Sequence, residues 1–200
     1  MRYLSSFTRF AFISGGLFVL AAIVFWNAAT WLVVDEPERS DVILIVEGSK
    51  DGHFAKGLAL FQGGFGKQII VTEEVDHLVF GQTRADFANQ FIRNKMANLA
   101  NRIDVCPTHE DLRDSVAQII RCIPNVGVQR ILLVTSDYET RGTLSVFNRL
   151  VPQYHWSVAA AEDASKFGYR WWRNREWAKQ TFLEWNKLLW WNCVDRWHKP

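Results

Sequence analysis

The sequence predicts an α/β fold, in which a Rossmann-like, mostly parallel sheet of about five strands has helices on both faces and follows one N-terminal transmembrane helix. Unbroken apolar runs rich in β-branched residues recur along the chain, as in strands buried on both faces. Segments with helical spacing separate these runs, so that strand and helix alternate five times, which is typical of a parallel sheet. An uncharged stretch from residue 10 to residue 34 predicts the membrane helix.

The strands are predicted from the apolar runs. The clearest is 129–135, because its last five positions continue one apolar, β-branched pattern that ends in Thr135. Pro107 ends the third strand, and Thr108 is expected to cap the helix that follows. The predicted strands are 41–46, 67–72, 102–106, 129–135 and 154–160.

The helices are predicted from apolar residues that recur near a 3.6-residue period, at 53–62, 83–100, after Thr108, at 139–150 and at 174–196. The last helix lies in the part of the chain that holds eight of the ten tryptophans. We interpret most of this as core packing, on a face formed by Ala178, Phe182, Trp185, Leu189 and Cys193. Candidates for contact with the bilayer interface or a partner are Trp190, Trp191 and Trp197.

The stretch 10–34 is long enough, at about 1.5 Å rise per residue, for a helix to cross a hydrocarbon core of about 30 Å. Trp26 and Trp31 near its end fit an interfacial aromatic belt. A cleaved signal peptide is the alternative, with residues 27–29 as a weak cleavage site. The apolar stretch is longer than a signal peptide needs, which favours an uncleaved anchor in contact with membrane lipid.

The charges on either side of this stretch predict its orientation. Arg2 and Arg9 precede it, and Asp35, Glu36 and Glu38 follow it. The positive-inside rule then keeps the N-terminus in the cytoplasm and exports the α/β domain across the inner (plasma) membrane. In a Gram-negative cell the domain would lie in the periplasm. The expected organisation is a cytoplasmic tip and single-pass anchor at 1–34, a polar linker at 35–40 and an α/β domain at 41–200.

Composition and motifs exclude several functions. Beyond residue 34 the chain carries 21 basic and 21 acidic residues, and a neutral domain is a poor partner for nucleic acid. No phosphate-binding or dinucleotide-binding loop occurs and the histidines lack ligand spacing, so we expect no cofactor and no metal. The three cysteines, Cys106, Cys122 and Cys193, leave two alternatives: one disulfide with a free thiol, or three buried thiols.

A ligand of such a sheet binds outside the carboxyl ends of the strands. Acidic and hydroxyl groups follow several predicted strands, with few cations among them. Plain helix capping is the alternative for any one carboxylate. The candidate acid–base groups are Asp137 and Glu139, and the candidate ligand-binding residues are Glu47, Gly48, Asp51, His53, Thr72, Ser136 and Arg141.

Residues 134–138 (Val-Thr-Ser-Asp-Tyr), with Thr140 and Arg141 after them, resemble a segment of the bacterial YdcF/SanA/ElyC-like family. Residues 41–46 with Gly48 resemble the first strand and turn of that family, and 170–179 resemble the Trp-rich ending of one subgroup. The resemblance implies an N-terminal anchor or signal and a Rossmann-like domain. It also implies a role in envelope integrity, in peptidoglycan or lipid-carrier metabolism.

The chain departs from the family at its site. The family usually has His at the position of Glu139, a second Arg at Gly142, and Arg where His53 stands. The resemblance therefore implies a divergent member whose pocket has fewer cations and an added carboxylate. Two functions follow: an envelope enzyme acting on a cell-wall or lipid-linked precursor, with Arg141 holding the anion, or a non-catalytic ligand-binding or scaffold domain with a degenerate site.

Overall fold

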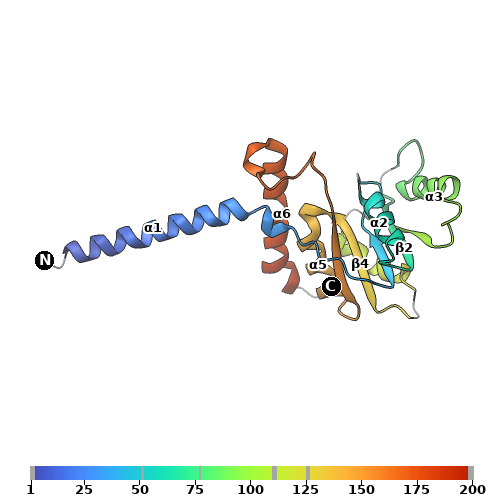
Figure 1. Cartoon of the computed structure of the whole chain (residues 1–200), viewed down its shortest axis with the longest axis horizontal. Coiled ribbons are helices and arrows are strands. Elements are labelled where there is room, and N and C mark those ends of the chain that lie inside the picture. The colour runs from blue at the N-terminus through green and yellow to red at the C-terminus, as the bar shows by residue number, and fades with distance from the viewer. Residues whose placement is uncertain (1–2, 51, 77, 110–111, 125–126, 198–200) are drawn as a thin grey trace.

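The computed structural model describes residues 3–50, 52–76, 78–109, 112–124 and 127–197. Its centre is a five-stranded sheet in which every neighbouring pair of strands is parallel, in the order β3-β2-β1-β4-β5 (Figure 1). The predicted α/β class and parallel sheet are confirmed. The strands are β1 (Val42–Ile45), β2 (Gln68–Glu74), β3 (Ile103–Thr108), β4 (Arg130–Ser136) and β5 (His155–Ala161).

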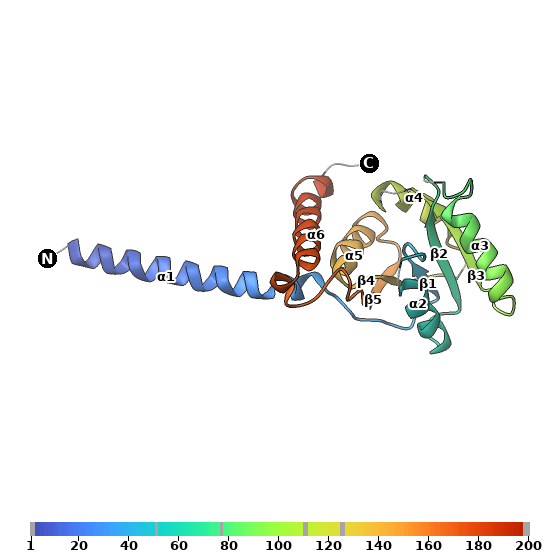
Figure 2. The same cartoon turned by 90° about the horizontal axis from the view of Figure 1, so that it is seen from above.

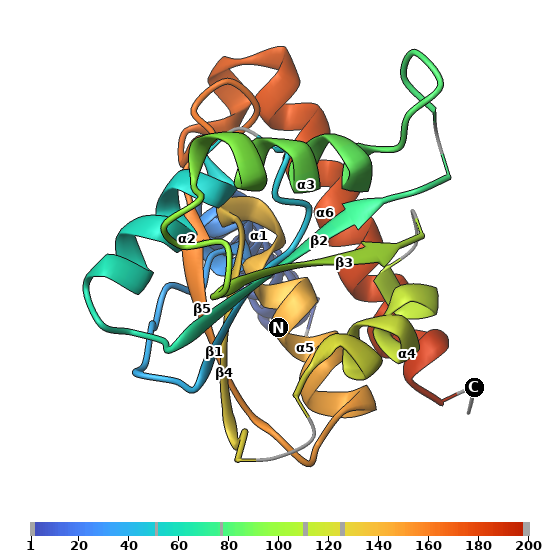
Figure 3. The same ribbon diagram turned by 90° about the vertical axis from the view of Figure 1, so that its right-hand side faces the viewer.

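Helices cover both faces of the sheet. Figure 3 shows α2 and α3 on one side of the strands and α4 and α5 on the other. The α-helices are α1 (Tyr3–Asn27), α2 (His53–Gln62), α3 (Arg84–Lys95), α4 (Leu112–Cys122), α5 (Thr140–Leu150) and α6 (Arg175–Cys193). Short 3-10 turns are η1 (Thr30–Leu32), η2 (Asp137–Glu139), η3 (Trp171–Arg173) and η4 (Asp195–Trp197).

The sheet is buried on both faces because successive strand residues point to opposite sides. Val42 and Leu44 of β1 pack in the cluster that contains α4 and α5 residues, and Ile43 and Ile45 pack in the cluster that contains α2 and α3 residues. All four side chains are buried. The continuous apolar runs of the sequence are therefore explained by two cores, one on each face.

Two local predictions around β3 are wrong. The strand continues through Pro107, which pairs with Glu73 of β2, and ends at Thr108 rather than placing that threonine as a helix cap. The reason is position, because β3 is an edge strand and an edge tolerates a residue without an amide hydrogen. Helix α3 is shorter than predicted and begins at a capping box between Thr83 and Asp86.

The buried face predicted for the last helix is also wrong. Phe182, Leu189 and Cys193 are exposed, while α6 buries Trp191 and Glu184 on its other side. The physical reason is that α6 covers no face of the sheet, so it has no apolar core to bury this stripe against. It packs at the end of the domain instead, where Trp191 Nε1 donates a hydrogen bond to Ser145 Oγ (3.0 Å).

The N-terminal helix α1 projects away from the α/β domain (Figures 1 and 2). Across the residues that the structure describes, no helix combines the length and apolarity needed to cross a membrane. After α1 the chain turns onto the domain, where Ala29 and Leu32 are buried against Tyr138 and Phe167.

The polar segment 35–40 runs along the edge of the sheet. The Asp35 carboxylate accepts a hydrogen bond from the backbone N–H of Ala160 (3.0 Å), and the Glu36 N–H donates to the carbonyl of Val158 (2.9 Å). These contacts cover the outer edge of β5, which would otherwise expose unpaired backbone groups.

Of the two predicted arrangements of the cysteines, the structure has the one with a disulfide and a free thiol. Cys106 of β3 and Cys122 of α4 form a disulfide, and Cys193 at the end of α6 is free and exposed. The disulfide fastens α4 to the edge strand of the sheet. A covalent link of this kind restricts the unfolded chain more than the folded one.

Replacing Leu133 by Ala should lower the free energy of unfolding by about 2–5 kcal/mol, because this fully buried side chain would leave a cavity in the core. Urea unfolding of the full chain in detergent measures the change. Leu78→Ala, at an exposed position, is the control and should stay within about 0.5 kcal/mol of the wild type. A loss below 1 kcal/mol for Leu133→Ala would contradict the buried sheet.

The disulfide joins residues separated by 16 positions, so its removal in a Cys106→Ala, Cys122→Ala double variant should cost about 3 kcal/mol. Native wild-type protein should incorporate one equivalent of a thiol reagent, at Cys193. Three equivalents without prior reduction would show that the bond is absent.

Candidate functional site

The turn after β1 brings the chain close against β2. The backbone N–H of Glu47 donates to Thr72 Oγ1 (3.0 Å), and the N–H of Gly48 donates to the Thr72 carbonyl (3.1 Å). Glu47 adopts a left-handed backbone conformation, with φ of 48°, and a Cβ on Gly48 would lie 2.2 Å from Val71 Cγ1. Strain of this kind at a strand end is often kept for function. Thr72 and Gly48 therefore position this turn.

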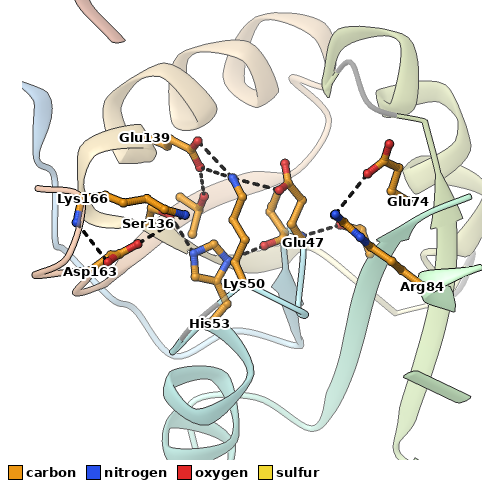
Figure 4. A network of polar contacts seen from close by, with 12 residues as sticks. Glu47, Lys50, His53, Glu74, Arg84, Ser136, Glu139, Asp163 and Lys166 are labelled. Carbon is orange, nitrogen blue, oxygen red and sulfur yellow. Dashed lines mark hydrogen bonds and ion pairs between the residues drawn. The ribbon is translucent and has the colours of Figure 1, made fainter. Parts of the chain in front are cut away.

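Lys50 lies between two carboxylates at the point where the strand order reverses, between β1 and β4 (Figure 4). Its Nζ is 2.8 Å from Glu47 Oε2 and 3.2 Å from Glu139 Oε1. Burial opposes the charge on the amine, but the carboxylates of Glu139 and Glu47 outweigh it and raise the pKa of Lys50 above its usual range. The site thus contains a permanent cation that holds Glu139 in place, together with a hydrogen bond from Thr135 Oγ1.

His53 and Ser136 form a buried hydrogen-bonded pair beside this cluster, each with 1% of its surface exposed. His53 Nδ1 is 2.6 Å from the Val46 carbonyl and Nε2 is 2.8 Å from Ser136 Oγ. A carbonyl only accepts, so Nδ1 carries the hydrogen and Nε2 accepts from the serine hydroxyl. Burial lowers the pKa of His53, which makes the ring neutral near pH 7. The pair ties the start of α2 to the end of β4.

Asp137 is the other predicted acid–base residue and stands at the start of η2. Burial raises the pKa of its carboxyl to about 6, and the nearby charges of Asp163 and Glu162 add to this. The backbone N–H of Tyr138 donates to Asp137 Oδ1 (3.0 Å) and opposes the shift. A carboxyl that titrates close to neutrality is suited to proton transfer.

A cavity of about 540 Å³ adjoins the cluster at the carboxyl ends of β1 and β2. Its polar lining includes three cations, Lys50, Arg84 and Lys166. Figure 4 shows Arg84 directed at Glu74 and Lys166 at Asp163. Arg84 Nη1 is 3.2 Å from Glu74 Oε2, and Lys166 Nζ is 3.7 Å from Asp163 Oδ2. Its apolar lining includes three aromatic side chains, Phe54, Phe87 and Phe91, together with Val71, Ala88 and Ile92.

Glu73 supplies a carboxyl to the same cavity. The residue is 2% exposed, and its Oε2 is a buried oxygen without a hydrogen-bond partner within the described part of the chain. Burial raises the pKa of Glu73, although hydrogen bonds from Ser49 oppose this. A buried oxygen without a hydrogen-bond partner costs free energy, and this cost falls on the folded protein.

The structure brings together most of the predicted site residues: Glu47, Gly48, His53, Thr72, Ser136 and Glu139. Asp51 lies outside the described residues. Arg141 does not line the cavity, because its Nε donates to the carbonyl of Trp31. This contact gives the arginine a role in holding η1 against α5.

The expectation of few cations is wrong for the cavity. Lys50 lies in the loop after the first strand, so the sequence could have identified it as a cation at the site. Lys166 also lies in a strand-end loop, after β5. Arg84 begins α3, and no sequence pattern places the start of that helix at the site. Glu73 lies near the end of β2, and its importance at the site comes from its burial, which the sequence alone does not reveal. In the described ranges, no group of three or more His, Cys, Asp or Glu side chains is arranged to hold a metal ion.

Asp137→Asn should raise the melting temperature at pH 8 and leave it nearly unchanged below pH 4. In the folded protein the pKa of Asp137 is about 6, against 3.8 for an unperturbed aspartate. The free energy of unfolding of the wild type therefore falls as the pH rises past these two values, because the folded state must lose a proton that it binds more tightly than the unfolded state does. Asparagine keeps the acceptor for Tyr138 and removes the charge. Melting curves at both pH values measure the effect.

Asp86→Asn, at the exposed start of α3 and apart from Asp137, is the matched control. Hydrogen bonds from Thr83 lower the pKa of Asp86, so its loss should reduce stability at pH 8. Equal melting temperatures for wild type and Asp137→Asn at pH 8 would contradict the shifted pKa of Asp137.

Comparison with known proteins adds no function to this geometry. No protein-family model matches the chain, and a search of curated proteins finds no match. The resemblance to the YdcF-like family therefore stays a prediction from the residues quoted for it. What the chain does is argued from the site itself.

Proposed function

We propose that this chain is a membrane-anchored, extracytoplasmic α/β domain of the YdcF-like family that acts in cell-envelope metabolism, of peptidoglycan or of its lipid carrier, through a small-ligand pocket. The observation that carries the proposal is the cavity at the carboxyl ends of β1 and β2. Ligands of open parallel sheets bind at this edge, near the reversal of strand order. The resemblance of residues 41–48 and 134–141 to the family supports the envelope role.

The lining of the cavity indicates the chemistry of its ligand. Arg84 and Lys166, whose ion pairs are part-exposed, suit an anionic group such as a phosphate, and three phenylalanine side chains suit an adjoining apolar part. Glu73 adds a carboxyl to the lining of the cavity. Lipid-linked cell-wall precursors combine a phosphate, an apolar chain and sugar hydroxyl groups in one molecule. They are the class of cell-wall precursor that we propose.

Three features support the location outside the cytoplasm. The disulfide between Cys106 and Cys122 belongs to an oxidising compartment, since cytosolic thiols are kept reduced. Positive charge before the uncharged stretch 10–34 and negative charge after it favour export of the domain. Apolar side chains of α1, among them Phe18 and Leu20, are exposed, as in a helix that contacts lipid. We propose a single-pass anchor in the plasma membrane on this basis.

Binding without catalysis is the function that the geometry supports best. His53 and Ser136 are buried in contact with each other, and Lys50 ties up Glu139, so the protein's own side chains fill the point of strand reversal. Neither Asp137 nor Glu139 lines the cavity. Hydrolysis or transfer is the second candidate, and the observation in its favour is the raised pKa of Asp137, about 6.

Geranyl phosphate, which joins a phosphate to a short apolar chain, is a suitable probe for the cavity. It should raise the melting temperature of the full chain in detergent, while inorganic phosphate and geraniol should do so less because each lacks one half of the ligand. An Arg84→Ala, Lys166→Ala double variant should bind roughly tenfold or more weakly, since a charge-assisted hydrogen bond contributes about 1.5–3 kcal/mol.

Arg93→Ala, an exposed position on the same helix as Arg84 and outside this cavity, is the matched control and should bind as the wild type does. The pocket assignment fails if the double variant keeps the full stabilisation. It also fails if Arg93→Ala loses as much affinity as the double variant.

A further inference from the structure

Helix α6 has an exposed apolar face that the packing of the domain leaves uncovered. Phe182, Leu189 and Trp190 are 69%, 54% and 61% exposed, and Leu183 lies beside them. Positions seven and eight residues apart project from the same side of a helix, so these side chains lie on one face, which also carries the exposed Asn186. Large apolar side chains gathered on one exposed face mark an interaction site.

The position of α6 indicates what that surface meets. Figures 1 and 2 both show α6 at the end of the domain nearest α1 and running across the α1 axis. Its buried side faces α5, where Trp191 donates to Ser145. The exposed face is therefore turned away from the domain, toward the side from which α1 approaches.

Hydrogen bonds fasten the end of α1 to α6 and to the turn before it. Trp185 Nε1 of α6 donates to the Ala28 carbonyl (2.9 Å), and Trp171 Nε1 of η3 donates to the Phe25 carbonyl (3.1 Å). These contacts hold the end of α1 and the residue after it beside α6 and η3. If α1 stands across a bilayer, α6 lies along the bilayer surface.

The side chains around this junction suit the boundary between hydrocarbon and water. Phe25 packs on Trp171 with ring centroids 4.6 Å apart, and Trp26 packs on Trp172 at 4.7 Å. Tryptophan is enriched at membrane interfaces because its ring is apolar and its N–H is polar. Lys179, on the exposed side of α6, adds a cation within reach of anionic headgroups.

We propose that α6 is an interfacial helix whose exposed face, Phe182, Leu183, Leu189 and Trp190, lies among the lipid headgroups of the bilayer that α1 crosses. The inference rests on the anchoring that is part of the proposed function. It adds a second membrane contact that fixes the orientation of the domain, and of its cavity, relative to the bilayer. A single flexible tether would leave that orientation free.

Cys193 provides a site-specific probe, because it is the exposed free cysteine and lies on the same face as Phe182 and Leu189. The full chain is labelled there with an environment-sensitive fluorophore and reconstituted into vesicles of phosphatidylethanolamine and phosphatidylglycerol. Lipids that carry a quencher in the headgroup region should quench the label strongly. A Phe182→Ser, Leu189→Ser, Trp190→Ser variant should lose at least half of this quenching while it still floats with the vesicles.

Phe80→Ser, at a fully exposed position in a loop before α3, is the control and should leave the quenching unchanged. Protein that floats with an unquenched wild-type label would overturn the interfacial role of α6 and leave the anchor intact. Protein that fails to float would overturn the anchor and, with it, this inference. Energy transfer between labels on two chains, without lipid quenching, would assign the surface to a second copy instead.

Discussion

Strand β1 is paired along both edges, to β2 on one side and to β4 on the other, and both of its faces are buried. The rest of the site depends on this constraint. The connections that leave β1 and β4 must diverge to opposite faces of the sheet, so their loops cannot pack on each other as neighbours on one face do. The space that opens between them receives Lys50, Glu47 and Glu139.

The electrostatics of the site follow from that placement. The positive charge of Lys50 offsets the repulsion between the carboxylates of Glu47 and Glu139. The same two carboxylates keep the Lys50 amine charged. The neighbouring cavity differs, since its buried carboxyl Glu73 keeps an oxygen unpaired and its cations Arg84 and Lys166 have partners near the surface. The first arrangement holds the fold of the loops together, and the second leaves groups for a ligand.

Sequence patterns predicted what depends on local chemistry. The apolar runs located the strands, and the loops after them supplied Glu47, Ser136 and Glu139. Patterns failed where tertiary position decides. Helical periodicity identified a stripe on α6 but gave no means of telling whether the stripe faces a core or a surface, and Phe182 is exposed. Arg84 reaches the cavity only because β2 lies between β1 and β3, which is a property of the strand order.

The central claim is that a ligand occupies the cavity beside β1 and β2. Backbone amide NMR of the full chain during titration with geranyl phosphate tests it residue by residue. The account predicts the largest shifts at Gly48, Ser49 and Ala88, which line the cavity, with small shifts at Arg141. Shifts centred on Arg141 and Trp31, or no saturable shift at any of the cavity residues, would contradict it.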